Sequence, residues 1–104
     1  MAAATNRDDP HRRARRALHR HLAGDREAIA AAMLTYDGRY ASLGAYVRRE
    51  IEEHLPDYLA WIPDYLDLDA VARDWVAQGR NWALPDRKTG GVHVFLARDP
   101  RAGR

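Results

Sequence analysis

The sequence predicts a small α+β domain that is mostly helical and ends in a β-hairpin. Three observations support this prediction. From residue 10 to residue 78, apolar residues recur every three or four positions, as they do on amphipathic helices. After Gly79 the spacing changes to two, as in strands. The chain has 104 residues, which is room for one domain with one modest core.

The N-terminal third is expected to be helical and basic. Residues 1–9 are small and polar, and we expect a flexible arm there. A first helix is predicted over Pro10–Ala23, because proline is tolerated at a helix start and apolar residues recur every four positions. Gly24 and Asp25 then provide a stop and a new N-cap. A second, alanine-rich helix follows over Arg26–Leu34, and its apolar side is expected to consist of Ile29, Met33 and Leu34.

The segment Tyr36–Tyr40 contains Asp-Gly and is predicted to be a loop. Ser42 is the expected N-cap of a helix over Leu43–Leu55, which the following proline ends. A short turn is expected over Asp57–Trp61, with its apolar and aromatic side chains mostly buried.

Asp67 is the predicted N-cap of the next helix, Leu68–Gln78, and Gly79 follows as a natural helix stop. Strands are predicted at Asn81–Leu84 and Val92–Ala97. An isolated two-stranded hairpin is marginally stable in water, so this hairpin must pack on the helices. The residues expected to make that contact are Trp82, Leu84, Val92, Val94 and Leu96.

These elements suggest four parts: a flexible arm (1–9), a basic helical segment (10–35), a domain (36–98) and a tail (99–104). The chain lacks cysteine, so disulfides and thiolate metal sites are excluded. Its apolar runs are far shorter than the roughly 20 residues of a membrane span. The first residues lack the basic-then-apolar order of a signal peptide. We therefore expect a soluble cytoplasmic protein without a membrane partner.

Motifs for catalysis are missing from the sequence. Ser42 is the single serine and is already used as a cap, and there is no nucleophile elbow or phosphate-binding loop. His19 and His21 lie two positions apart and point in different directions on a helix. Glu50 and His54 have acceptable ligand spacing, but no second pair accompanies them. We expect no catalytic, cofactor-binding or metal-binding residues, and therefore no enzyme.

Two charged segments remain as candidate binding surfaces. The first 35 residues carry seven arginines against four acids, a net charge of +3. Arginines on the first helix would make salt-dependent contacts with phosphates, or would form a solvated face that pairs with the acidic half of a second subunit. These candidate nucleic-acid contacts are Arg12, Arg13, Arg15, Arg16 and Arg20.

The acidic segment is the stronger candidate. From Glu50 to Asp74 the chain has eight acids against Arg73 alone, a net charge of −7. Ordinary solvated faces mix both signs, whereas a face of one sign suits a basic partner such as a DNA-binding protein. The predicted partner-binding acids are Glu50, Glu52, Glu53, Asp57, Asp64, Asp67, Asp69 and Asp74.

Four segments resemble the last domain of the ArdA antirestriction family, in the same order and spacing. They are YDGRYASLGAY (36–46), LPDYL (55–59), YLDLDAVARDW (65–75) and GVHVF (91–95), and the likeness covers about residues 28–98. Members of that family are elongated dimers, carried by plasmids, transposons and phages, whose surface carboxylates imitate the phosphates of bent DNA. They occupy the DNA-binding groove of type I restriction–modification complexes.

The resemblance implies a non-enzymatic inhibitor that is encoded by a mobile element. Its working groups would be the acids of residues 50–74. Its partner would be a type I restriction–modification complex or another DNA-binding protein, and it would act as a homodimer. Two alternatives stay open. One is a nucleic-acid-binding accessory protein that uses the arginine helix, and the other is a protein–protein adaptor without inhibitory activity.

Overall fold

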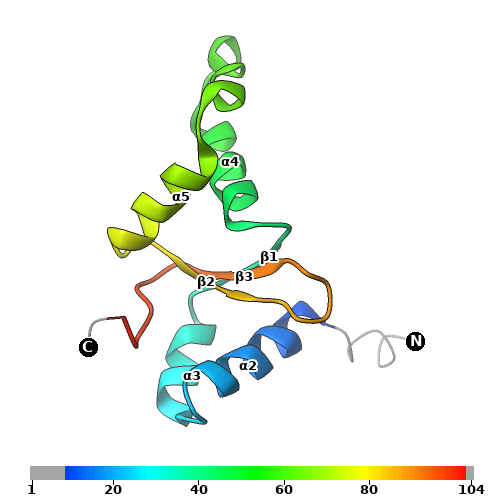
Figure 1. Cartoon of the computed structure of the whole chain (residues 1–104), viewed down its shortest axis with the longest axis vertical. Coiled ribbons are helices and arrows are strands. Elements are labelled where there is room, and N and C mark those ends of the chain that lie inside the picture. The colour runs from blue at the N-terminus through cyan, green and yellow to red at the C-terminus, as the bar shows by residue number, and fades with distance from the viewer. Residues whose placement is uncertain (1–8, 103–104) are drawn as a thin grey trace.

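The computed structural model describes residues 9–102 and confirms a mixed, mostly helical α+β fold (Figure 1). The predicted flexible arm lies almost entirely outside the described residues, as does the end of the predicted tail. The elements in chain order are α2 (Pro10–His21), α3 (Arg26–Met33), β1 (Tyr36–Tyr40), α4 (Leu43–His54), η2 (Asp57–Leu59), η3 (Ile62–Tyr65), α5 (Leu68–Ala77), β2 (Trp82–Pro85) and β3 (Val92–Phe95).

Within residues 9–102, the strands form one three-stranded antiparallel sheet in the order β1-β3-β2. The predicted hairpin is present as β2 and β3, but the prediction of a loop over Tyr36–Tyr40 was wrong. That segment is β1, which pairs with β3 from Tyr36 opposite Phe95 to Tyr40 opposite Val92. The Asp-Gly turn signal corresponds to an irregularity in this strand, because the register shifts between Tyr36 and Gly38 and Gly38 has a φ of 143°.

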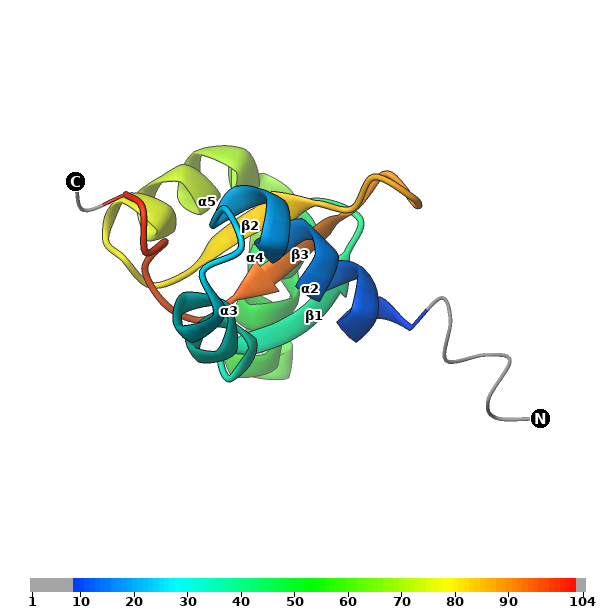
Figure 2. The same cartoon turned by 90° about the horizontal axis from the view of Figure 1, so that it is seen from below.

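The sheet is the middle layer of the molecule. Helices α2 and α3 cover one face, and α4 and α5 cover the other (Figures 1 and 2). Because successive side chains of a strand point to opposite faces, β3 contributes to both layers. Phe95 packs with Trp82 and Leu18 on the first face, whereas Val94 packs with Tyr46 and Val47 on the second. The basic segment 10–35 therefore shares a core with the strands of the segment 36–98.

Side-chain caps fix the starts of the helices. The predicted caps Asp25, Ser42 and Asp67 are confirmed, and each accepts a hydrogen bond from a backbone N–H three residues further on. Asp9 also caps α2 through the N–H of His11. These contacts satisfy N–H groups that the first turn of a helix leaves unpaired.

Several apolar residues predicted to be buried are exposed. Leu34 is 88% exposed, because it lies just beyond the last residue of α3. Leu96 is 46% exposed and follows the end of β3. Tyr58 and Trp61, at 77% and 57%, lie in the turn between α4 and α5 at the end furthest from the sheet (Figure 1). The prediction of a mostly buried turn was therefore wrong for its aromatic side chains.

Candidate functional site

The acidic residues predicted as a partner-binding face all lie on one projecting unit, residues 43–77, which we call the acidic arm. It consists of α4, the turns η2 and η3, and α5, and it extends away from the sheet (Figure 1). Helices α4 and α5 pack against each other. The acidic arm has eight acids and three arginines, a net charge of −5. Seven of the acids are exposed and Glu50 is half-buried.

Arginines on α4 neutralise part of this surface. Arg48 forms ion pairs with Glu52 and Asp64, and Arg49 Nε lies 3.1 Å from Glu53 Oε2. Exposed pairs of this kind contribute little to stability, because water and salt screen them. The predicted net charge of −7 covers residues 50–74 and does not include these two arginines. The surface is therefore less acidic than that charge indicates.

The predicted acids therefore have different roles. Asp67 caps α5 through its carboxylate. Among the described residues, Asp57, Asp69 and Asp74 make no ion pair or side-chain hydrogen bond. These three carboxylates are exposed and available to a partner without loss of an internal contact.

The end of the acidic arm also exposes aromatic side chains that the sequence analysis expected to be buried. Trp61 and Tyr65 meet edge to face with ring centroids 5.6 Å apart. Tyr65 is 80% exposed, and Tyr58 and Leu66 are exposed beside them along the chain. Exposed aromatic groups among charged residues are typical of protein–protein contact surfaces. We call Tyr58, Trp61, Tyr65 and Leu66 the aromatic tip.

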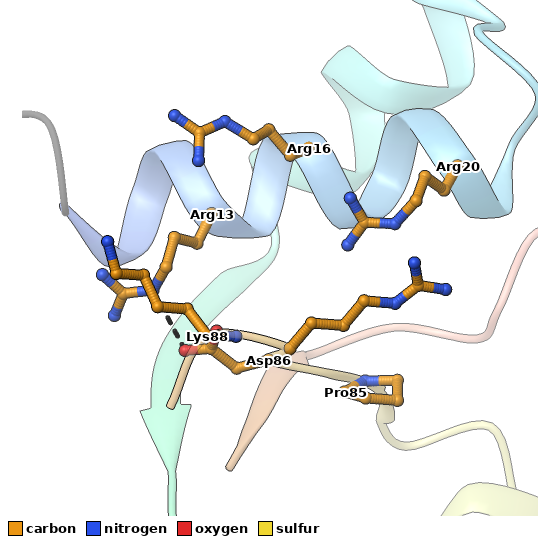
Figure 3. A pocket seen from close by; sticks show the side chains of 7 residues that line it. Arg13, Arg16, Arg20, Pro85, Asp86 and Lys88 are labelled. Carbon is orange, nitrogen blue, oxygen red and sulfur yellow. Dashed lines mark hydrogen bonds and ion pairs between the residues drawn. The ribbon is translucent and has the colours of Figure 1, made fainter. Parts of the chain in front are cut away.

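A second candidate site lies on the other side of the sheet, between α2 and the loop that joins β2 to β3 (Figure 3). A hollow of about 110 Å³ is lined by Arg13, Arg16 and Arg20 of α2 and by Arg87 and Lys88 of this loop. An adjoining hollow of about 230 Å³ shares Arg20 and Arg87. We call these five residues and the two hollows the basic groove.

Three of the five predicted nucleic-acid contacts thus line the basic groove, and Arg12 and Arg15 do not. Arg87 and Lys88 were not predicted from the sequence. They stand more than 60 positions from α2 in a turn of ordinary composition, so only the packing of the hairpin on α2 brings them to this site.

Asp86 holds the loop against α2. Its carboxylate accepts hydrogen bonds from Arg13 Nε at 3.1 Å, from Thr89 Oγ1 at 2.7 Å and from the backbone N–H of Lys88 at 3.1 Å. Burial alone would raise the pKa of Asp86, but these donors outweigh it and lower the pKa to about 2. The carboxylate therefore stays charged and keeps the loop in place.

His93 lies beneath this contact and is fully buried. The Tyr36 hydroxyl is 2.9 Å from His93 Nδ1 and 3.5 Å from the backbone carbonyl of Pro10, and burial raises the pKa of Tyr36 to about 12, so the hydroxyl keeps its proton. His93 Nε2 faces the Asp86 carboxylate at 3.7 Å. Burial lowers the pKa of His93 below its usual value, although the Asp86 carboxylate opposes this effect.

These two groups predict a loss of stability in acid. His93 has a lower pKa folded than unfolded, so the unfolded chain binds the proton first as pH falls below about 6.5. The pKa of Asp86 is also lower in the folded chain than its usual 3.8, so stability falls again as pH drops below about 3.8. The shift of this pKa to about 2 corresponds to about 2 kcal/mol of folding free energy. We expect the free energy of unfolding, measured by urea titration, to fall in two steps from pH 7 to pH 2.

The control for this measurement is His93→Gln, which should remove the upper step and leave the lower one. A wild-type stability that is constant between pH 7 and pH 5 would contradict the assignment to His93.

Two of the other histidines form side-chain hydrogen bonds. His21 Nε2 contacts the carboxylate of Asp99 at 3.0 Å, and His54 Nδ1 contacts the backbone carbonyl of Glu50 at 2.8 Å. Over residues 9–102 there is no group of three or more side chains that could hold a metal ion. In the same part of the chain, every helix is too short or too polar to cross a bilayer.

A scan against models of protein families, a search of curated proteins and a search of solved structures each find no match to this chain.

Proposed function

We propose that the protein is an antirestriction-type DNA mimic, which acts in the cytoplasm and inhibits a type I restriction–modification complex through the acidic arm. The observation that supports this most is the separation of charge. The acids stand on α4, on α5 and on the turns between them, whereas α2, which carries the arginines, packs on the opposite face of the sheet (Figure 1). A basic DNA-binding surface can therefore meet the carboxylates without meeting α2. The segments that resemble the ArdA family cover β1, the first turn of α4, the turn η2, most of α5, and β3.

Charge density suggests that two copies act together. Helix α4 has 12 residues and is about 18 Å long. The acidic arm is longer than α4 because the turns η2 and η3 extend beyond it, so its net charge of −5 gives at most one charge per roughly 4 Å, whereas duplex DNA carries one per about 1.7 Å. A homodimer that sets two acidic arms side by side would double this density and bring it closer to that of DNA. An apolar hollow of about 480 Å³ on the acidic arm, lined by Leu43, Ala72 and Val76 among others, offers contact surface for such a dimer.

The test is a DNA cleavage assay with a purified type I enzyme and its unmodified substrate. We expect the full chain to inhibit cleavage. We also expect added non-substrate duplex DNA to displace the chain from the enzyme, because both would occupy the DNA-binding groove of the enzyme. Undiminished cleavage at a large excess of the chain would exclude this function.

The aromatic tip predicts a specific contribution to this contact. Trp61→Ala should weaken inhibition about tenfold or more, because exposed tryptophans at interfaces are frequent hot spots. The free energy of unfolding should change by less than about 0.5 kcal/mol, because the side chain is more than half exposed. Titration of the cleavage assay gives the first number and urea unfolding gives the second.

Leu34→Ala is the control, because Leu34 is more exposed than Trp61 but lies on the other side of the sheet. An equal effect of both variants on inhibition would contradict a contact at the aromatic tip.

The aromatic tip also favours a second candidate, a protein–protein adaptor that does not inhibit. Aromatic contacts tolerate salt, whereas contacts between carboxylates and a basic groove weaken as salt rises. An adaptor would bind its partner through Trp61 with affinity that salt hardly changes. A mimic would lose affinity steeply between 50 mM and 200 mM salt.

A further inference from the structure

We propose that the basic groove binds the phosphate backbone of duplex DNA without regard to sequence. The proposal goes beyond inhibition by the acidic arm and does not depend on it. It rests on the position of Arg87 and Lys88, which the fold places opposite the arginines of α2 (Figure 3).

The spacing of the α2 arginines suits a run of phosphates. Arg13, Arg16 and Arg20 stand at positions i, i+3 and i+7 and share one side of the helix. Seven residues rise about 10.5 Å. Phosphates of one DNA strand recur every 3.4 Å along the axis, so this length spans about three of them. Arg87 and Lys88 add charge along the facing wall of the groove.

Three of the five cations of the groove have no acidic partner among the described residues. Within residues 9–102, Arg16, Arg20 and Arg87 form no ion pair. Asp86, the acid that lines the hollow, is 3% exposed and already accepts three hydrogen bonds. Like charges held together repel one another, and a bound polyanion relieves this repulsion.

The lining predicts contacts with phosphates and no reading of bases. Its residues include no asparagine or glutamine that could pair with a base edge. His21, the aromatic ring of the lining, is held by Asp99. Phosphate contacts of this kind position a protein on DNA but carry no sequence information.

The test is fluorescence anisotropy with a labelled 20-base-pair duplex of random sequence and the full chain. With about three phosphate contacts, from Arg16, Arg20 and Arg87, affinity should fall about 10–100-fold between 50 mM and 200 mM salt. The variant Arg16→Gln/Arg87→Gln removes one cation from each wall. It should weaken binding at least tenfold at 100 mM salt and reduce the slope of log K against log salt by about 2.

The matched control is Arg15→Gln/Arg26→Gln. It removes the same charge from exposed positions of α2 and α3 that do not line the groove, and it should change affinity less than threefold. Circular dichroism checks that both variants fold, and a second groove variant, Arg20→Gln/Lys88→Gln, repeats the test.

Four results would overturn the proposal: no binding of the wild type at 50 mM salt, equal weakening by the control, competition by poly-glutamate as effective as competition by DNA, or concentration-dependent self-association that the groove variant abolishes. The last would assign the groove to the acidic arm of a second copy. Because the groove variant keeps every acid of the acidic arm, its inhibition of a type I enzyme reports separately on the proposed function.

Discussion

Replacing Phe95 by alanine is expected to lower the free energy of unfolding by about 3–5 kcal/mol. Phe95 is fully buried on the central strand. Its ring stacks on Trp82 with centroids 4.8 Å apart and lies 5.4 Å from Tyr36. The substitution removes these contacts and leaves a cavity between the sheet and the layer of α2 and α3. Domains of this size are stable by only about 5–15 kcal/mol, so the variant should unfold at a much lower urea concentration.

The next residue along the chain supplies the control. Leu96 is 46% exposed, and Leu96→Ala should cost less than about 1 kcal/mol. Phe95→Leu keeps part of the volume and should give an intermediate loss, which keeps the comparison possible if Phe95→Ala does not fold. Urea unfolding followed by tryptophan fluorescence measures all three. A loss below 1 kcal/mol for Phe95→Ala would contradict the core described here.

The helices could be predicted from the sequence because their signals are local. Asp25, Ser42 and Asp67 each stand directly before a run with helical spacing, and each is a cap in the structure. The strands β2 and β3 could be predicted because the spacing of apolar residues changes to two after Gly79.

The strand β1 could not be predicted, because its signal is not local. Asp37 and Gly38 have the composition of a turn, and what makes the segment a strand is pairing with β3 more than 50 residues further on. The buried turn was mispredicted for a related reason: composition shows that Tyr58 and Trp61 are apolar, but not that no other element covers them.

The two candidate sites also differ in how far they could be predicted from the sequence. The acidic arm is a continuous stretch of chain, so its acids could be named in advance, although Arg48 and Arg49 reduce its charge. The basic groove joins α2 to a distant loop, and its arrangement depends on the buried contact of Asp86 with Arg13. The α2 side of the groove could be predicted from the sequence, whereas the side formed by Arg87 and Lys88 could not.

The second large effect is expected from reversing charge on the acidic arm. Asp57→Lys/Asp74→Lys changes the charge of the arm from −5 to −1 and alters carboxylates without a described internal contact. Asp67 is left in place because it caps α5. If the carboxylates imitate phosphates, the variant should inhibit a type I enzyme at least a hundredfold less well, while its free energy of unfolding changes by less than about 1 kcal/mol.

The control adds the same four charges on the other side of the sheet, as Glu27→Lys/Ala30→Lys/Ala31→Lys at exposed positions of α3. The direct measurement is the concentration of each chain that halves DNA cleavage by the type I enzyme at fixed salt. Mimicry by the acidic arm predicts a rise of a hundredfold or more for Asp57→Lys/Asp74→Lys and a rise of less than threefold for the α3 control. Equal inhibition by both variants and the wild type would contradict it.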